Sequence, residues 1–333
     1  MLVQAAISHL SAPPAVAFAL VLAIALPGPA AEIDSVTGRR HALGDASRPL
    51  DRRIDRALRV GVERANETGS PCDEAELYAR VREAIASPFI GHQLAEELND
   101  AEELDTRHVR LAESIYRDLS LIDAISVHLK GLSALVRVGD HVVGVDKLGH
   151  FFVEGWRYFD IAYLRGEGID AALDWGEKTE RTYFGLYTTG IYSYADLAAN
   201  FEGMRFWLRL VGREPDPLRS GYFFNRPYVS CGRRLFSREP HWKVNRRVRL
   251  RTWVSGAWDE GINCSRYASA EIASRVARRV EERERADDAH YACPIVPDAC
   301  VDVRERYGQI AARLLHPDCR AAEPVPGPWW WPF

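Results

Sequence analysis

An unbroken run of twelve apolar residues, AVAFALVLAIAL at 15–26, is the feature that most constrains this chain. A membrane-spanning helix needs about 20 such residues, whereas the core of a secretory signal peptide needs about 7–15. Cleavage after Ala30 would place Gly28 and Ala30 at the small-residue positions of a signal-peptide site. No Lys or Arg precedes the run, and a buried helix or an uncleaved anchor is the alternative. We predict a signal peptide over 1–30 and an extracytoplasmic chain, periplasmic or secreted, with no transmembrane span after cleavage.

The cysteines of the mature chain predict disulfides. An even number of cysteines in an exported chain favours pairing, and a zinc site is the weaker alternative because no CxxC pair occurs. A helix over 298–316 would separate the last two cysteines by about 28 Å at 1.5 Å per residue, whereas a disulfide needs Cα atoms within about 7 Å. We therefore expect Cys300 to pair elsewhere, with Cys293 as one choice. The six are Cys72, Cys231, Cys264, Cys293, Cys300 and Cys319.

Apolar residues recur every three or four positions through most of the chain, which predicts helices. From Trp242 to Trp253 apolar and basic residues alternate, which predicts a strand within a Pro-, Gly- and aromatic-rich stretch. Ser70 fits the N-cap of one helix and Asn263 that of another. The expected helices cover 49–66, 70–87, 106–137, 145–165, 169–187, 193–210, 265–288 and 298–316.

These elements predict a mainly α fold: a helical, bundle-like domain with a small irregular, β-containing insertion, linked by disulfides. We place the helical domain at 31–212 and the insertion at 213–262. Helices of 263–316 pack on the same domain, and a Pro- and Trp-rich tail covers 317–333.

One stretch combines charged and large apolar residues at helical spacing. Asp146, His150 and Glu154 are four residues apart, so each step rotates by only about 40° and all three share a helix face. Acids and an imidazole beside large apolar groups need partners or an ion. Carboxylates and imidazole are ligands of divalent metals, so the spacing predicts a metal site.

Two following helices carry polar groups of the same kind. Asp196 and Asn200 are again four residues apart, and Gly203 continues their face, where it would let another helix approach closely. Glu180 lies between the two motifs. If the three helices pack together, these side chains converge with Asp146 and His150.

The sequences DKLGHF and SYADLAANFEG carry a resemblance to a known family. They resemble the D-K-x-x-H-F and S-x-x-D-x-x-A-N-x-x-G pattern of VanZ-like proteins, and they are similar to predicted periplasmic bacterial families of unknown function. The resemblance covers about 144–207, and Glu180 resembles the acidic residue between the family motifs. VanZ-like proteins are multi-pass membrane proteins, whereas this chain is expected to be soluble. The resemblance implies a shared polar constellation and no particular chemistry.

Two hypotheses remain. In the first, an envelope hydrolase binds a divalent metal with Asp146, His150 and either Glu154 or Asp196, while Glu180 acts as base and Asn200 orients substrate. In the second, the same polar groups only tie three helices together in a non-catalytic envelope protein. Ser193 and Asp196 fit a capping box, which supports the second.

Other polar groups permit weaker interpretations. A basic strand face could bind an anionic surface of a cell-envelope component, although a solvated face is the simpler reading. Asp259 or Glu260 could be catalytic. A net charge of −4 gives no reason to expect nucleic acid, and the common hydrolase, P-loop and dinucleotide motifs are missing. The basic face consists of Lys243, Arg247, Arg249 and Arg251.

Overall fold

The computed structural model describes residues 32–68, 71–85, 104–219, 226–233 and 239–323. The expected signal peptide, the expected cap Ser70 and the Trp-containing end of the tail lie outside these residues. No helix among the described ranges combines the length and apolar character needed to cross a membrane.

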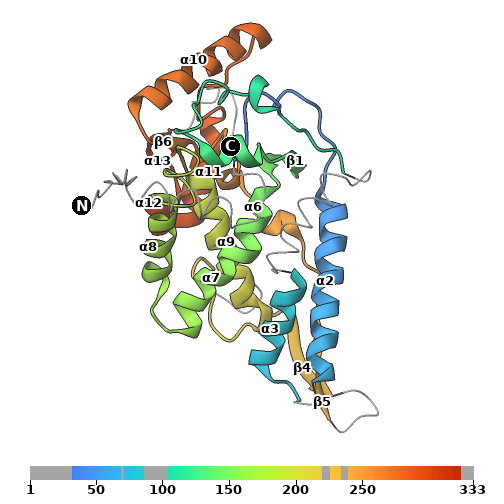
Figure 1. The fold of residues 1–333 in the computed structure, drawn as a ribbon. Coiled ribbons are helices and arrows are strands. Elements are labelled where there is room, and N and C mark those ends of the chain that lie inside the picture. Colours follow the sequence, from blue (N-terminus) through green and yellow to red (C-terminus); the bar gives the residue numbers. More distant parts are fainter. Residues whose placement is uncertain (1–31, 69–70, 86–103, 220–225, 234–238, 324–333) are drawn as a thin grey trace, which may run out of the picture.

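The described part of the chain is mainly helical, and its core surrounds one buried helix (Figure 1). Every residue of α9 (Tyr194–Val211) from Tyr194 to Leu210 is buried. Beside α9 runs a continuous helix of four segments, two of them π-helical. These are α6 (Asp146–Gly149), η2 (His150–Glu154, π), α7 (Gly155–Phe159) and η3 (Asp160–Leu164, π). The next helix, α8 (Ile169–Glu180), contacts both α7 and α9.

Two glycines set the distance between these central helices. A Cβ atom on Gly203 would lie 1.9 Å from the Phe151 carbonyl oxygen, and one on Gly155 would lie 2.5 Å from the Gly203 Cα. The helices therefore meet backbone to backbone, as the position of Gly203 predicts. This contact brings η2 directly against α9.

Short antiparallel pairs of strands lead into the central helices. The hairpin of β1 (Leu135–Val138) and β2 (His141–Gly144) ends immediately before α6. Strand β3 (Ile191–Ser193) runs directly into α9 and pairs with β6 (Ser265–Tyr267), Ser193 facing Ser265. This pairing carries the segment before β6 to the start of α9.

The remaining elements cover the core. Helices α2 (Ser47–Glu67) and α3 (Glu74–Ile85) pack together beside the hairpin of β4 (Val229–Arg233) and β5 (Pro240–Val244). Helix α10 (Ala270–Asp287) projects at the opposite end (Figure 1). Short helices fill the rest: η1 (Leu111–Glu113), α5 (Ile125–Lys130), η4 (Leu250–Thr252), η5 (Gly256–Trp258), α11 (Pro297–Tyr307), η6 (Gly308–Ile310), α12 (Ala311–Leu314) and α13 (Pro317–Ala321).

All six cysteines form disulfides, but the expectation for Cys300 is wrong. The pairs are Cys72–Cys231, Cys264–Cys293 and Cys300–Cys319. The expected helix over 298–316 does not continue: α11 ends at Tyr307, Gly308 has φ +53°, and the chain folds back so that α13 contacts α11. The Cα atoms of Cys300 and Cys319 are therefore only 5.1 Å apart.

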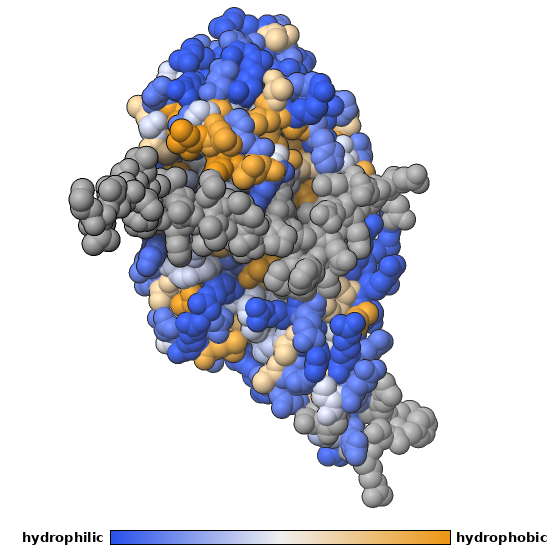
Figure 2. All heavy atoms as spheres, viewed as in Figure 1, coloured by the Kyte–Doolittle hydropathy of each residue, from blue (hydrophilic) through white to orange (hydrophobic). Residues whose placement is uncertain are grey.

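The expected helix over 106–137 is also wrong. Only α5 is α-helical there, Gly131 turns the chain with φ +75°, and the segment ends in β1. Two of the apolar residues of this stretch, Ile122 and Leu129, are 91% and 60% exposed. On the face in Figure 2, hydrophobic residues gather in a patch below α10, and the described surface around them is mostly hydrophilic.

Smaller corrections concern element ends. The strand expected over 242–253 ends at Val244, although Arg247 and Arg249 still alternate with buried Val248 and Leu250. Helix α10 begins at Ala270, where Ser269 is the cap, so Asn263 is not an N-cap. Instead, the buried Asn263 amide donates to the carbonyls of Ala257 and Leu314.

Candidate functional site

A buried lysine lies at the centre of the polar residues. Lys147 Nζ is 2.8 Å from Asp146 Oδ2, 2.5 Å from Asp196 Oδ1 and 2.7 Å from Glu260 Oε1. Burial disfavours the ammonium, but Asp146, Asp196 and Glu260 outweigh this effect and hold the pKa of Lys147 well above its ordinary value. Lys147 is therefore a fixed cation shared by three acids.

His150 lies beside this lysine at the edge of the cluster. Its Nε2 is 3.1 Å from Asp196 Oδ2, and its Nδ1 is 3.1 Å from the Asn200 amide. The amide nitrogen of Asn200 also meets the backbone carbonyls of Asp196 and His150, each at 3.2 Å, and this assigns the amide orientation. Asn200 thus donates to Nδ1, so the proton of neutral His150 is on Nε2.

Two effects oppose each other at His150. Burial disfavours the imidazolium, but the Asp196 carboxylate outweighs burial and raises the pKa of His150 to about 9. Protonation of Nδ1 would require the Asn200 amide to turn its oxygen toward the ring and to lose both carbonyl contacts. The pKa of Asp196 is lowered, because His150 and Lys147 together outweigh its burial.

Three of the sequence-predicted residues have the geometry of a metal-binding set. One ligand atom each from Asp146, His150 and Asp196 lies within 4.8 Å of the others. Asp146 Oδ1 is buried and has no hydrogen-bond partner in the described part of the chain. Asp146 Oδ1 also occupies the space that a side chain at position 144 would need, since a Cβ on Gly144 would lie 2.0 Å from this oxygen. The donor set, one imidazole and two carboxylates, suits a divalent transition metal.

Glu154 does not belong to this set, although the spacing places it on the same face. The turn between His150 and Glu154 is π-helical rather than α-helical, and the set within 4.8 Å consists of Asp146, His150 and Asp196. Glu154 is half-buried, whereas Asp146, Glu180 and Asp196 are fully buried. Burial raises the pKa of Glu154, and His150 partly offsets this rise.

Glu180 lies at the end of α8 and reaches the start of α9. Its Oε1 accepts a hydrogen bond of 3.0 Å from the backbone N–H of Ser193. The turn that follows wraps around it, since a Cβ on Gly185 would lie 2.6 Å from Glu180 Oε1. Burial, followed by the charge of Asp196, raises the pKa of Glu180 to about 8. A proton therefore stays on Glu180 at neutral pH.

This shift predicts a specific dependence of stability on pH. Between pH about 4.5 and about 8 the unfolded chain releases the proton that folded Glu180 keeps, so this group lowers stability as pH rises through that window. Glu180→Gln retains the acceptor for Ser193 without an ionisable group. We expect its melting temperature, relative to that of the wild type, to rise between pH 5 and pH 9.

Glu167→Gln is the matched control for that experiment, since Glu167 is 51% exposed and lies outside the cluster. Its melting temperature should follow the wild type at every pH. Parallel pH profiles for Glu180→Gln and the wild type would contradict the assignment of a buried, protonated Glu180.

Sequence reasoning did not assign three residues to the cluster, although it named one of them, Glu260, as a residue that could be catalytic. Lys147 is next to Asp146 in the sequence, but helical spacing assigns it to another face. Glu260 is far away in sequence, and Ser193 Oγ donates to it at 2.9 Å. Glu32 is buried near these acids because its carbonyl accepts from Ser133 N–H in a bridge beside α6. Burial and the charge of Glu260 raise the pKa of Glu32 well above its ordinary value.

The structure decides two other expectations from the sequence, one about the acids Asp259 and Glu260 and one about the capping box of Ser193 and Asp196. Asp259 forms a two-point ion pair with Arg39, at 2.7 and 2.9 Å, so it ties chain segments together while its neighbour Glu260 joins the cluster.

Ser193 caps α9 by accepting a hydrogen bond from Asp196 N–H, but the N–H of Ser193 donates to Glu180 and not to Asp196. Only half of a capping box forms, and the Asp196 carboxylate is left for Lys147 and His150.

The basic face lies elsewhere, against α2. All four of its side chains are in exposed residues: Lys243, Arg247, Arg249 and Arg251. Arg247 Nε is 3.7 Å from Asp55, and Arg251 pairs with Asp45. Its binding to an anionic surface stays a prediction.

No family model matches the chain, and neither the curated proteins nor the solved structures contain a match to it. The similarity of its two motifs to VanZ-like proteins therefore stays a prediction, and the chemistry must be argued from the residues themselves.

Proposed function

We propose that this protein is an exported cell-envelope protein that binds a divalent transition-metal ion through Asp146, His150 and Asp196. The observation that carries the proposal is the mutual distance of at most 4.8 Å between one ligand atom of each residue. These three side chains come from two elements, the helix that begins at α6 and the first turn of α9. The backbone contact at Gly155 and Gly203 fixes the two elements against each other.

The charges of the cluster support a metal ion in place of the proton on His150. Five carboxyl groups are buried together, and Lys147 and His150 are the cationic groups among them. The pKa of Glu260 is raised to about 7, first by burial, and Lys147 only partly offsets this. Buried acids in such excess must keep protons or bind a metal ion. The five are Glu32, Asp146, Glu180, Asp196 and Glu260.

The position of His150 supports access from solvent. Its side chain is 20% exposed, whereas those of Lys147 and Asp196 are 0% and 6% exposed. His150 is therefore the side of the cluster from which an ion would enter. With an ion on Nε2 the ring proton would be on Nδ1, and the Asn200 amide, 3.1 Å away, would turn its oxygen to accept from it, the role that outer hydrogen bonds serve in metal sites.

The same residues support hydrolysis as the chemistry of the site. A bound divalent ion acts as a Lewis acid and lowers the pKa of bound water. Glu154 is half-buried, whereas the carboxyl groups of the cluster are buried, so Glu154 reaches solvent. We assign to Glu154 the transfer of a proton from the bound water. Glu180 is a poor base because it is buried and keeps its proton, so the sequence-based assignment of the base is replaced. Asn200 orients His150 rather than substrate.

One observation favours a second candidate, a purely structural network. Lys147 already contacts three of the acids and would tie α6, α9 and the segment before β6 together without any metal. In that case the cluster stabilises one arrangement of the helices, and His150 is simply one more hydrogen-bonded member.

Export is supported by the leader-like run at 15–26 and by the disulfides. The six cysteines of the chain are all paired, and disulfides persist mainly in oxidising compartments outside the cytoplasm. Together they favour the periplasm or the exterior as the place where the protein works.

Metal binding by purified mature protein tests the proposal. We expect isothermal titration with Zn²⁺ or Mn²⁺ to show one ion per chain, and His150→Ala to weaken binding at least 100-fold, because one of three ligands is lost. The folded structure should persist, since His150 is at the edge of the cluster. Circular dichroism and thermal melting check the fold of each variant.

His290→Ala is the matched control. His290 is 69% exposed and pairs with Glu284 at the end of α10, so its removal should leave the metal stoichiometry and affinity unchanged. Equal binding by both variants, or no ion bound by the wild type, would contradict the metal proposal and leave the structural network.

A further inference from the structure

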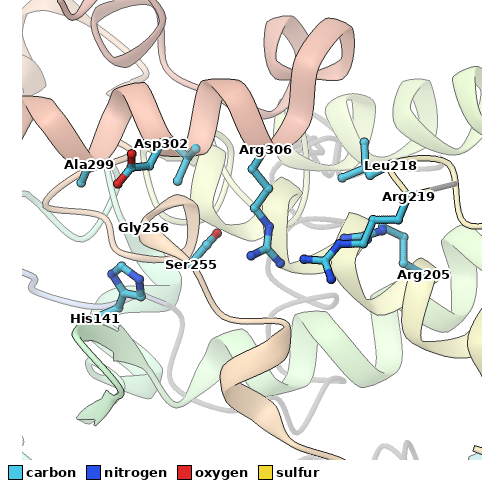
Figure 3. Close-up of a pocket in the computed structure, with 10 residues that line it drawn as sticks. His141, Arg205, Leu218, Arg219, Ser255, Gly256, Ala299, Asp302 and Arg306 are labelled. Atoms are coloured by element: carbon cyan, nitrogen blue, oxygen red, sulfur yellow. The ribbon is translucent and has the colours of Figure 1, made fainter. Parts of the chain in front are cut away.

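The arginine-lined pocket in Figure 3 contains acids as well as bases. It has a volume of about 400 Å³, and Asp302 adds a carboxylate to its wall. Arg205 binds both oxygens of Asp216, at 2.9 and 3.0 Å, and Arg306 donates twice to Glu202 Oε1, at 3.0 and 2.9 Å. These arginines already have partners within the chain. Apolar side chains, by contrast, lie uncovered on another part of the surface.

Six of the eight exposed large hydrophobic side chains in the described ranges lie on two segments, 121–129 and 183–187. The first segment includes most of α5, and the second is in the turn that follows α8. Ile122 is 91% exposed and Tyr187 is 74% exposed. Single exposed apolar residues are ordinary, whereas a group of them marks an interaction surface. The six, which form the apolar surface, are Leu121, Ile122, Leu129, Tyr183, Phe184 and Tyr187.

Backbone contacts join the two segments. Ser126 N–H donates to the Thr188 carbonyl at 2.8 Å, and a Cβ on Gly190 would lie 2.7 Å from the Asp123 carbonyl oxygen. Asp123 also pairs with Arg275 of α10 at 3.0 Å, so the first segment lies beside α10. Figure 2 shows hydrophobic residues gathered below this helix. The two segments therefore present their exposed side chains from one region of the molecule.

The turn after α8 is fixed by its own hydrogen bonds. Thr188 Oγ1 donates to the carbonyls of Tyr183 and Phe184, at 2.9 and 3.3 Å, and Tyr187 N–H donates to the Thr182 carbonyl at 3.0 Å. The rings of Tyr183 and Phe184 lie 4.6 Å apart, and both residues are exposed. Because these backbone groups already have partners, a surface that covers the rings would leave none of them unpaired.

Lysines flank the apolar surface. Lys130 follows Leu129, and Lys178 is in the last turn of α8, directly before the second segment. Neither lysine has an ion pair within the described segments, and burial alone lowers the pKa of Lys130. The acids nearest in sequence already have arginine partners, or, like Glu180, belong to the buried cluster. The pairs are Asp118 with Arg279, Asp123 with Arg275, Asp174 with Arg313 and Glu177 with Arg181.

The character of this surface favours a lipid bilayer over a protein partner. Ile122 is almost fully exposed, so its side chain projects from the surface instead of lining a groove. A projecting aliphatic side chain can enter a fluid bilayer, whereas a protein partner needs a hollow that matches it. Tyrosine suits the boundary between lipid and water, because its ring is apolar and its hydroxyl is polar. The flanking ammonium groups attract anionic headgroups.

We propose that the apolar surface docks this protein onto an anionic phospholipid bilayer, with Ile122 and Leu129 in the acyl region and Tyr187 at the level of the headgroups. The chain would then be held at the membrane as a peripheral protein, by side chains that lie in the plane of the lipid boundary. Docking requires no metal ion, so it is independent of the proposed metal centre.

Sedimentation of the metal-free, disulfide-intact mature protein with lipid vesicles tests this inference. One vesicle is phosphatidylcholine, and the other is phosphatidylcholine mixed with an equal part of phosphatidylglycerol. We expect the wild type to bind the anionic vesicle. The double variant Ile122→Ser, Leu129→Ser should bind it at least tenfold more weakly, because two apolar side chains are lost from the acyl region. Lys130→Gln should weaken this binding about fivefold, since one attraction to the headgroups is removed.

Leu164→Ser is the matched control. Leu164 is 53% exposed, as Leu121 is, but it precedes α8, whose 12 residues span about 18 Å, whereas the aromatic turn follows that helix. This variant should bind as the wild type does, and circular dichroism should show every variant folded. No binding of the wild type to the anionic vesicle, equal binding to both vesicles, or undiminished binding by the double variant would overturn the inference. A dimer in ultracentrifugation that the double variant loses would also overturn it, and would identify a second copy of this chain as the partner.

Discussion

Lys147→Met is expected to lower the free energy of unfolding by about 3–5 kcal/mol at pH 7, the range measured when one partner of a buried ion pair is removed. Lys147 Nζ contacts Asp146, Asp196 and Glu260, and all three acids are buried. Methionine keeps the length and packing of the side chain but leaves these carboxylates with no ammonium between them. Urea denaturation with a chelator present measures the loss without any contribution from metal.

Lys178→Met is the control for this substitution, because Lys178 is exposed on α8 and its replacement should change stability by less than about 0.5 kcal/mol. The loss in Lys147→Met should also shrink at pH 5, where the acids can take up protons. A loss in Lys147→Met no larger than that in Lys178→Met would mean that the cluster does not depend on its lysine.

Gly203→Ala is expected to cost roughly 3 kcal/mol or more and to abolish metal binding. The added Cβ would lie 1.9 Å from the Phe151 carbonyl oxygen and 2.9 Å from the Gly155 Cα. Both neighbours are backbone atoms, so no side chain can rotate away and the helices must separate. That separation would move His150 away from Asp196, since the two come from opposite sides of the contact. Thermal melting and metal titration measure the two effects.

Gly149→Ala provides the comparison on the same pair of helices. Gly149 is also helical, but a Cβ there would have no atom within 4 Å apart from its chain neighbours and the backbone of its own helix. Alanine is the better helix former by about 1 kcal/mol, so this variant should be as stable as the wild type or more stable. If Gly203→Ala were as stable as Gly149→Ala, the close helix contact would be refuted.

Strong helical periodicity predicted the fold class and most of the central helices. The helix expected over 49–66 appears as α2, and the one over 193–210 appears as α9. The expected helix over 106–137 fails because apolar spacing alone does not show which residues find a core. Gly131 adopts a positive φ there, and the hairpin that begins at Leu135 takes up the last apolar residues.

The disulfide error has the same kind of cause. The exclusion of Cys300–Cys319 depended on one uninterrupted helix, and Gly308 interrupts it. A glycine inside a helical pattern is a weak signal, and the packing that makes the chain turn at this one is not encoded locally.

About half of the acid cluster could be predicted. Helical spacing predicted that Asp146 shares a helix face with His150, and Asp196 with Asn200. The structure places these four side chains around the same point. Lys147 was missed because a long side chain can reach across a helix from another face. Glu260 and Glu32 arrive through β3–β6 pairing and through the bridge beside Ser133, which are long-range contacts without a local sequence signature.

Anomalous diffraction from crystals of the mature protein grown with Zn²⁺, recorded at the zinc absorption edge, tests the central proposal most directly. We expect one strong peak per chain, within bonding distance of His150 Nε2 and of carboxylate oxygens from Asp146 and Asp196. A map in which Lys147 Nζ keeps its contacts and no peak lies near His150 would contradict the metal centre and identify the cluster as a structural network.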